Sequence, residues 1–438
     1  MNLTVDQVLG LSPDAASSAA GKKLANASAW QNPGQTDQLL WGECKGSALY
    51  QTRILLTDLS YKCSCPSRKF PCKHVLGLML LAAAQPGQVP KSAVPAWVAE
   101  WVEKREASSQ KREARAATQA EVSDPAAQAK RAEKRTARVA DGIAQLDVWL
   151  GDLARRGLAS LEAQPHTFWE NQAARLVDAQ APGLASRLRR MAALPGSGKT
   201  WPAKVAEQLG RLALVAHAFG RREQLAPGLE QDLRQIIGWT VAGQELAAGE
   251  KLLDEWLVVG QSVEHEDRVR VERSWLLGEK SRRVALILQF APQNAPFPEL
   301  IVPGTSFQGE ITYFPGEAPQ RARIVSRRTD PQPITGPLGG CASHEEFLAG
   351  VAQQLSRQPW RENFLCVVSN ATPEYVSGEF FLRDSLGAAL PLVGGDHWQL
   401  MALAGGNRVE FSGQWDGQGL LPMGVLADGE FHVLKSEI

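Results

Sequence analysis

Three cysteines and one histidine near the N-terminus have the side chains that zinc prefers as ligands in proteins. They occur as two close pairs, Cys63-Ser-Cys65 and Cys72-Lys-His74, separated by six residues. Four such ligands complete a tetrahedral zinc site. The sequence therefore predicts a structural zinc site with these four residues as its metal ligands. It indicates no catalytic and no cofactor-binding residues.

The segment between the two pairs contains Pro66 and Pro71, which suit a loop that folds back so that the pairs converge. The second pair comes directly before an apolar run, Val75–Ala84, that is typical of a buried helix, and Pro71 fits the start of that helix. Two alternatives are three free thiols that happen to lie beside a histidine, and a catalytic zinc. A catalytic zinc needs an open fourth position, and here all four positions are filled.

Basic residues surround the pairs in the sequence: Lys62, Arg68, Lys69 and Lys73. One interpretation is that they favour the thiolate forms and offset the net negative charge of a zinc ion bound to three thiolates. The other is a basic surface that contacts phosphates. Clusters of charge are more often solvated faces, which favours the first interpretation.

The segment 193–200, ALPGSGKT, formally fits a phosphate-binding loop. That loop needs a strand before it and a helix after it, whereas residues 186–192 have helical character and Pro202 disfavours a helical conformation at Trp201. We therefore expect a loop between two helices, with an NTPase site centred on Lys199 as the alternative.

Weaker signals have simple structural explanations. His265 lies among acidic residues that are typical of a hairpin tip. Cys341 and His344 lie where a helix is expected to begin. Trp97 and Trp101 are expected in the core or at an interface, with stacking on nucleic-acid bases as the alternative.

The composition indicates a globular protein without a strong charge preference. Lys+Arg and Asp+Glu number 47 each among 438 residues, so net charge does not indicate a nucleic-acid-binding protein. No apolar run reaches the length of a membrane span, and the N-terminus does not resemble a signal peptide. Six sparse cysteines favour a reducing compartment, and we expect a cytoplasmic protein without membrane contact.

Periodicity and composition divide the chain into four regions, which predict an α+β multi-domain fold. The N-terminal unit, 1–103, holds the zinc module at about 48–85. Residues 104–138 contain ten Lys/Arg against five Asp/Glu and almost no large apolar residue, which indicates a solvated helix or a disordered linker interrupted at Pro125. Helical spacing of apolar residues predicts an all-α region over 139–256, and short β-rich runs predict a β-rich region over 257–438 with one helix after Ser343.

The segment CSCPSRKFPCKHVLGLMLL resembles a SWIM zinc finger. The resemblance implies a small ββα module, with Cys63 and Cys65 on the hairpin side and Cys72 and His74 at the start of the helix. It also implies roles in protein–protein or DNA contact and, by similarity to bacterial SWIM-containing proteins, an AAA+ ATPase or von Willebrand A-type protein as partner. It implies no enzymatic activity.

Taken together, the sequence favours a non-catalytic, zinc-containing binding or adaptor protein. The alternatives are a DNA-binding protein that uses the finger and the basic linker, and an NTPase at 193–200.

Overall fold

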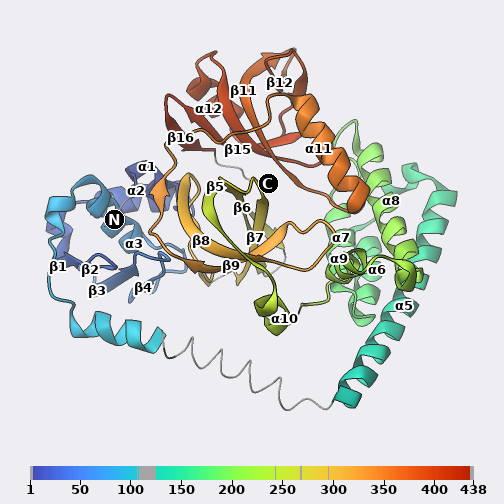
Figure 1. The fold of residues 1–438 in the computed structure, drawn as a ribbon, viewed down its shortest axis with the longest axis horizontal. Coiled ribbons are helices and arrows are strands. Elements are labelled where there is room, and N and C mark those ends of the chain that lie inside the picture. The colour runs from blue at the N-terminus through green and yellow to red at the C-terminus, as the bar shows by residue number, and fades with distance from the viewer. Residues whose placement is uncertain are drawn as a thin grey trace.

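The computed structural model describes residues 3–105, 107, 125–241, 243–266, 269–293 and 295–434. One six-stranded sheet lies in the middle of the molecule and a second lies above it in the view, with the N-terminal unit on one side and a helical bundle on the other (Figure 1). This arrangement matches the predicted α+β fold class: a zinc module, a helical region and a β-rich region.

The N-terminal unit is a four-stranded antiparallel sheet covered by helices. Two short helices come first and a third, the apolar one, lies buried against the sheet: α1 (Val5–Gly10), α2 (Ala15–Leu24) and α3 (Lys73–Ala84). The strands follow in chain order: β1 (Trp30–Gln35), β2 (Leu39–Lys45), β3 (Leu49–Leu55) and β4 (Tyr61–Cys63). Residues 96–105 form a further helix that carries Trp97 and Trp101.

The basic linker overlaps a long helix. Most of 104–124 lies outside the described residues, whereas α5 (Pro125–Arg156) begins at the proline where an interruption was expected. Residues 130–134 are exposed, and the buried face of α5 starts at Val139. This agrees with the prediction that the basic stretch buries no apolar face. The helix α5 therefore begins before residue 139, whereas its packing in the bundle core begins at Val139.

Four further helices pack with α5 around one apolar core that includes Ile143, Trp169, Leu188 and Leu212. They are α6 (His166–Asp178), α7 (Pro182–Met191), α8 (Trp201–Gly220) and α9 (Pro227–Ile237), and a short α10 (Gly243–Ala248) follows. Pro182 and Pro227 occupy the first positions of α7 and α9, where a missing N–H costs nothing. A Cβ added at Gly183 would lie 2.1 Å from the Ile236 oxygen, so this glycine permits the close contact of α7 with α9.

The β-rich region begins at Lys251, inside the range predicted to be helical up to 256. Its first sheet consists of β5 (Lys251–Glu266), β6 (Val269–Gly278), β7 (Val284–Pro292), β8 (Thr305–Tyr313), β9 (Arg321–Arg327) and β10 (Gln332–Pro333). β9 pairs with both β7 and β8, so five of these strands close into a barrel around Trp256 and Phe307.

The second sheet has the order β13-β12-β11-β14-β15-β16 and packs against the barrel through residues such as Trp275 and Met423. Its strands are β11 (Phe364–Val376), β12 (Glu379–Arg383), β13 (Ala389–Pro391), β14 (Val409–Trp415), β15 (Leu420–Ala427) and β16 (Glu430–Val433). Two helices pack on its core: α11 (His344–Arg357), which starts after Ser343 as predicted, and α12 (His397–Ala404), which was not predicted.

Candidate metal centre

The four predicted ligands come together at the junction of β4 and α3. Cys63 is the last residue of β4, Cys65 follows in the loop, Cys72 is the N-cap of α3, and His74 lies in its first turn. Their ligand atoms all lie within 4.8 Å of one another. A tetrahedral zinc ion with zinc–sulfur bonds of about 2.3 Å places ligand atoms roughly 3.7 Å apart. The cluster therefore fits a zinc ion after a small contraction.

The β3–β4 hairpin fixes the first ligand. Thr52 lies directly opposite Cys63 in the hairpin, and its hydroxyl donates a hydrogen bond to the Cys63 sulfur at 3.3 Å. Thr52 is fully buried, whereas Cys63 is partly exposed. A hydrogen bond to a thiolate orients the sulfur and favours its charged form.

The start of α3 fixes the second pair. The Cys72 carbonyl accepts the first hydrogen bond of the helix, from the Leu76 N–H. Pro71 directly precedes this N-cap residue. His74 is 4 % exposed, and its Nδ1 lies 3.7 Å from the Cys63 sulfur. The Tyr50 ring lies against the imidazole with ring centroids 4.8 Å apart, which restricts the rotation of the histidine side chain.

The three thiols are electrostatically coupled. The neighbouring Cys72 thiol, together with His74 and Thr52, lowers the pKa of Cys63 well below its ordinary value. The interaction with Cys63 raises the pKa of Cys72, while burial raises the pKa of Cys65. One thiolate is thus stabilised by its neighbours. A divalent ion would stabilise all three in the charged form, and with four protein ligands it would have no open position for a substrate.

The basic residues around the site do not all face solvent freely. The Lys69 ammonium lies 2.6 Å from a carboxylate oxygen of Asp14, which is the N-cap of α2. This contact, with a hydrogen bond from the Ser17 N–H, lowers the pKa of Asp14 to about 2. Lys62, Arg68 and Lys73 are exposed. The Lys69–Asp14 pair ties the ligand-bearing loop to α2. Neither interpretation of the basic residues from the sequence included this role for Lys69.

Several contributors to the site could not be identified from local sequence. Thr52, Tyr50 and Asp14 belong to no ligand pattern in the sequence, and only strand register or tertiary packing places them against the site. Cys44 is fully buried beside the cluster but is not one of its four members.

The other sequence signals do not form a second centre in the described part of the chain. Residues 193–200 connect α7 to α8, with a helix where a phosphate-binding loop needs a strand. β5 and β6 pair Glu266 with Val269, as predicted for a hairpin near His265. His344 is 1 % exposed beside Asp384, and neither of its ring nitrogens has a hydrogen-bond partner.

Trp97 and Trp101 contact Arg53 of β3, whose guanidinium carbon lies 5.2 and 6.0 Å from the two ring centroids. Both rings are half-buried.

The described helices include none that is long and apolar enough to cross a bilayer.

The fold and the cluster define a ββα metal-binding finger followed by a helical bundle. The SWIM zinc finger family matches residues 50–83, and the SWIM-associated four-helix bundle domain matches residues 134–237. No curated protein and no solved structure matches the chain. The chain is a SWIM-domain protein, and its Cys/His cluster lies within the residues that match the SWIM zinc finger.

Proposed function

We propose that this protein is a non-catalytic adaptor whose zinc-organised finger binds an acidic segment of a partner protein. The observation that carries the proposal is a groove of about 450 Å³ directly beside the metal cluster. One wall is the exposed face of α2, with Ala16, Ala20 and Leu24, and the other is the ligand-bearing loop.

The charge of this groove suits an acidic ligand. Lys45, Lys69 and Lys73 line it. Lys69 is paired with Asp14, whereas the ammonium groups of Lys45 and Lys73 have no partner within the described residues. Charged residues of one sign beside an apolar wall favour a peptide that carries both acidic and apolar side chains.

The partner class follows from the family resemblance. We propose an AAA+ ATPase or a von Willebrand A-type protein as the partner. A reducing, cytoplasmic setting is part of the proposal, supported by six cysteines that form no disulfide. We expect no nucleotide turnover, and no change in that result for Lys199→Ala.

Titration of a fluorescent Asp/Glu-rich peptide tests the groove. The double variant Lys45→Glu, Lys73→Glu reverses the charge of the two unpaired lysines. We expect its affinity to fall about tenfold or more, with zinc content unchanged. The matched control is Lys22→Glu, Lys23→Glu, which reverses two exposed lysines of α2 outside the groove. Equal affinity for wild type and the groove variant would refute the proposal.

Capture of purified candidate partners links the groove to the metal. We expect wild-type protein to retain an AAA+ ATPase or a von Willebrand A-type protein, and Cys63→Ala to lose it, because the ligand-bearing loop forms one wall of the groove. Retention of the partner by Cys63→Ala would separate binding from the zinc site.

A second candidate function is nucleic-acid binding at a different face of the finger unit. A hollow of about 430 Å³ is lined by Arg53, Lys62, Trp97 and Trp101. Half-exposed aromatic rings next to cations are the elements of a single-strand binding platform. However, Lys104 and Arg105, which also line the hollow, are paired with Glu100 and Asp58.

Titration with single- and double-stranded DNA at low and moderate salt tests this candidate, because phosphate contacts weaken steeply with salt. Binding through the hollow predicts that Trp97→Ala and Lys62→Glu weaken affinity. Binding through the finger loop predicts instead that Lys69→Glu and Lys73→Glu do so without loss of zinc. No binding at low salt would exclude both.

A further inference from the structure

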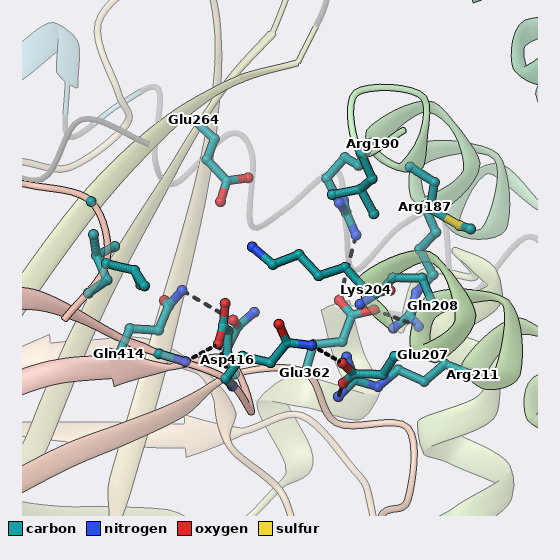
Figure 2. Close-up of a pocket in the computed structure, with 18 of the residues that line it drawn as sticks. Arg187, Arg190, Lys204, Glu207, Gln208, Arg211, Glu264, Glu362, Gln414 and Asp416 are labelled. Atoms are coloured by element: carbon teal, nitrogen blue, oxygen red, sulfur yellow. Dashed lines mark hydrogen bonds and ion pairs between the residues drawn. The ribbon is translucent and has the colours of Figure 1, made fainter. Parts of the chain in front are cut away.

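A cleft of about 510 Å³ lies between the helical bundle and the β-rich region, far in sequence from the finger. Side chains of α7 and α8 form one wall, and residues near β5, β6 and the β14–β15 turn form the other (Figure 2). Its volume is in the range of small-molecule sites, which occur preferentially where domains meet.

Ion pairs and hydrogen bonds between the two regions hold the walls in place. Arg187 of α7 lies 2.9 Å from Glu362, which precedes β11, and the two side chains are 12 % and 20 % exposed. Glu207 of α8 accepts a hydrogen bond from the Gln418 amide at 2.9 Å. Buried ion pairs gain little net stability because desolvation offsets the attraction. Their contribution here is to fix the spacing of the walls.

The charges in the cleft are not balanced. It holds five cationic and four anionic side chains, and each carboxylate has a partner. Glu362 contacts Arg187 and Arg190, Glu207 contacts Arg211, Glu264 contacts Arg273, and Asp416 accepts the Gln418 and Gly419 N–H groups.

Lys204 supplies the excess charge. Its ammonium has no hydrogen-bond or ion-pair partner within the described residues, although four carboxylates line the same cleft. Figure 2 shows its side chain extending from α8 into the open space. Lys204 is partly exposed, so its ammonium is accessible to a molecule that enters the cleft.

Apolar side chains complete the lining. Met191 and Leu194 contribute from the end of α7 and the loop after it, and Val393 and Leu421 contribute from the opposite wall. The cleft therefore offers a cation and an apolar surface within one cavity. That combination suits a molecule with a charged oxygen group on a carbon framework.

We propose that this cleft is a binding site for a small organic anion, in which Lys204 contacts a phosphate or carboxylate group of the ligand. The site is independent of the finger groove and adds a second, small-molecule ligand to the proposed adaptor. The fixed arginine–glutamate pairs pre-organise the walls, and the apolar residues accommodate the rest of the ligand.

Isothermal titration calorimetry of the full chain with AMP, succinate and adenosine tests this assignment. We expect AMP or succinate to bind, and the anion that binds identifies phosphate or carboxylate as the preferred group. Lys204→Gln is expected to weaken that binding about ten- to hundredfold, the range for loss of a charge-assisted hydrogen bond. Adenosine lacks the anionic group and is expected not to bind.

Two further variants make the result specific to the cleft. Gln208→Trp places a large ring in the cavity and is expected to abolish binding, whereas Lys199→Gln removes a lysine outside the lining and is expected to leave binding unchanged. Circular dichroism confirms folding of each variant. The proposal is overturned if neither anion binds wild type, if adenosine binds as well as AMP, or if Lys204→Gln binds like wild type.

Discussion

The loop of the finger and the helical bundle differ in how much apolar surface they bury. Between Cys63 and Cys72, Pro71 is the one buried residue, and the loop is held by its ligand pairs and by the Lys69–Asp14 contact. The bundle buries side chains such as Trp169, which is 1 % exposed, from every one of its main helices. We therefore expect the loop to depend on a metal for its geometry, and the bundle to depend on packing.

The largest expected effect is loss of metal. Cys72→Ala removes one ligand, and structural zinc contributes about 10–16 kcal/mol of binding free energy in isolated fingers. We expect residues 50–85 to become sensitive to protease while the bundle and the β-rich region stay resistant. Limited proteolysis mapped by mass spectrometry, with zinc analysis, measures this.

Cys44→Ala is the matched control, because Cys44 is buried beside the cluster without belonging to it. It is expected to keep both zinc and protease resistance. Unchanged resistance of residues 50–85 in Cys72→Ala would mean that packing of α3 alone maintains the finger.

A core truncation in the bundle is expected to have the opposite selectivity. Trp169→Ala leaves a large cavity and costs about 3–5 kcal/mol of stability. Zinc content is expected to stay at the wild-type level. Chemical denaturation followed by circular dichroism gives the loss of stability, with the exposed Val148→Ala as control. Loss of zinc together with the bundle would show that the two regions are coupled.

A buried carboxyl provides a third test, in the barrel. Burial raises the pKa of Glu272 to about 8, and Gln289 donates a hydrogen bond to it. The folded state therefore holds a proton that the unfolded state releases near its ordinary pKa. The stability that this protonated carboxyl gives to the folded state is fully present at low pH and is lost as pH rises towards 8.

Glu272→Gln removes this dependence and is expected to stabilise the protein by about 3 kcal/mol at pH 7. Denaturation midpoints between pH 5 and 8.5 measure the slope. The exposed Glu279→Gln is expected to keep the wild-type slope. An unchanged slope in Glu272→Gln would show that this carboxyl is already ionised in the folded protein.

The smallest expected effect concerns the loop contact. Asp14→Asn keeps an N-cap for α2 but removes the charge that faces Lys69. The lowered pKa of Asp14 makes the pair favourable above about pH 4, and this contribution is lost as pH falls towards 2. Because both side chains are partly exposed, we expect a cost of about 0.5 kcal/mol at pH 7.

Hydrogen exchange of residues 66–70 is expected to accelerate slightly in Asp14→Asn while zinc is retained. Ser18→Ala, at a partly exposed position on the same helix, serves as control. Loss of zinc in Asp14→Asn would make this pair as important as a ligand.

The metal site could be predicted because its four ligands lie within twelve residues of one another in the chain. The buried helix α3 could be predicted for the same reason, since its apolar run is continuous. The second helix of the β-rich region, α12, was not predicted. Its local sequence signal is Asp396, an N-cap residue whose side chain accepts a hydrogen bond from the Gln399 N–H.

Other features depend on tertiary structure. Residues 251–256 have apolar side chains at a spacing that fits a helix as well as a strand, and barrel closure decides the outcome by burying Trp256 and exposing Leu253. The cleft around Lys204 combines residues from 187 to 421, so no local pattern indicates it.

Closure of the barrel also affects how copies of this chain can associate. A strand with a free edge exposes backbone groups that another chain can pair with. In the barrel, β9 bonds to a neighbour on each side, so it offers no such edge. The outer strands of the second sheet, β13 and β16, remain at its margins. Among the described strands, self-assembly by strand addition is therefore directed away from β9 and towards outer strands such as these and β1, β4 and β10.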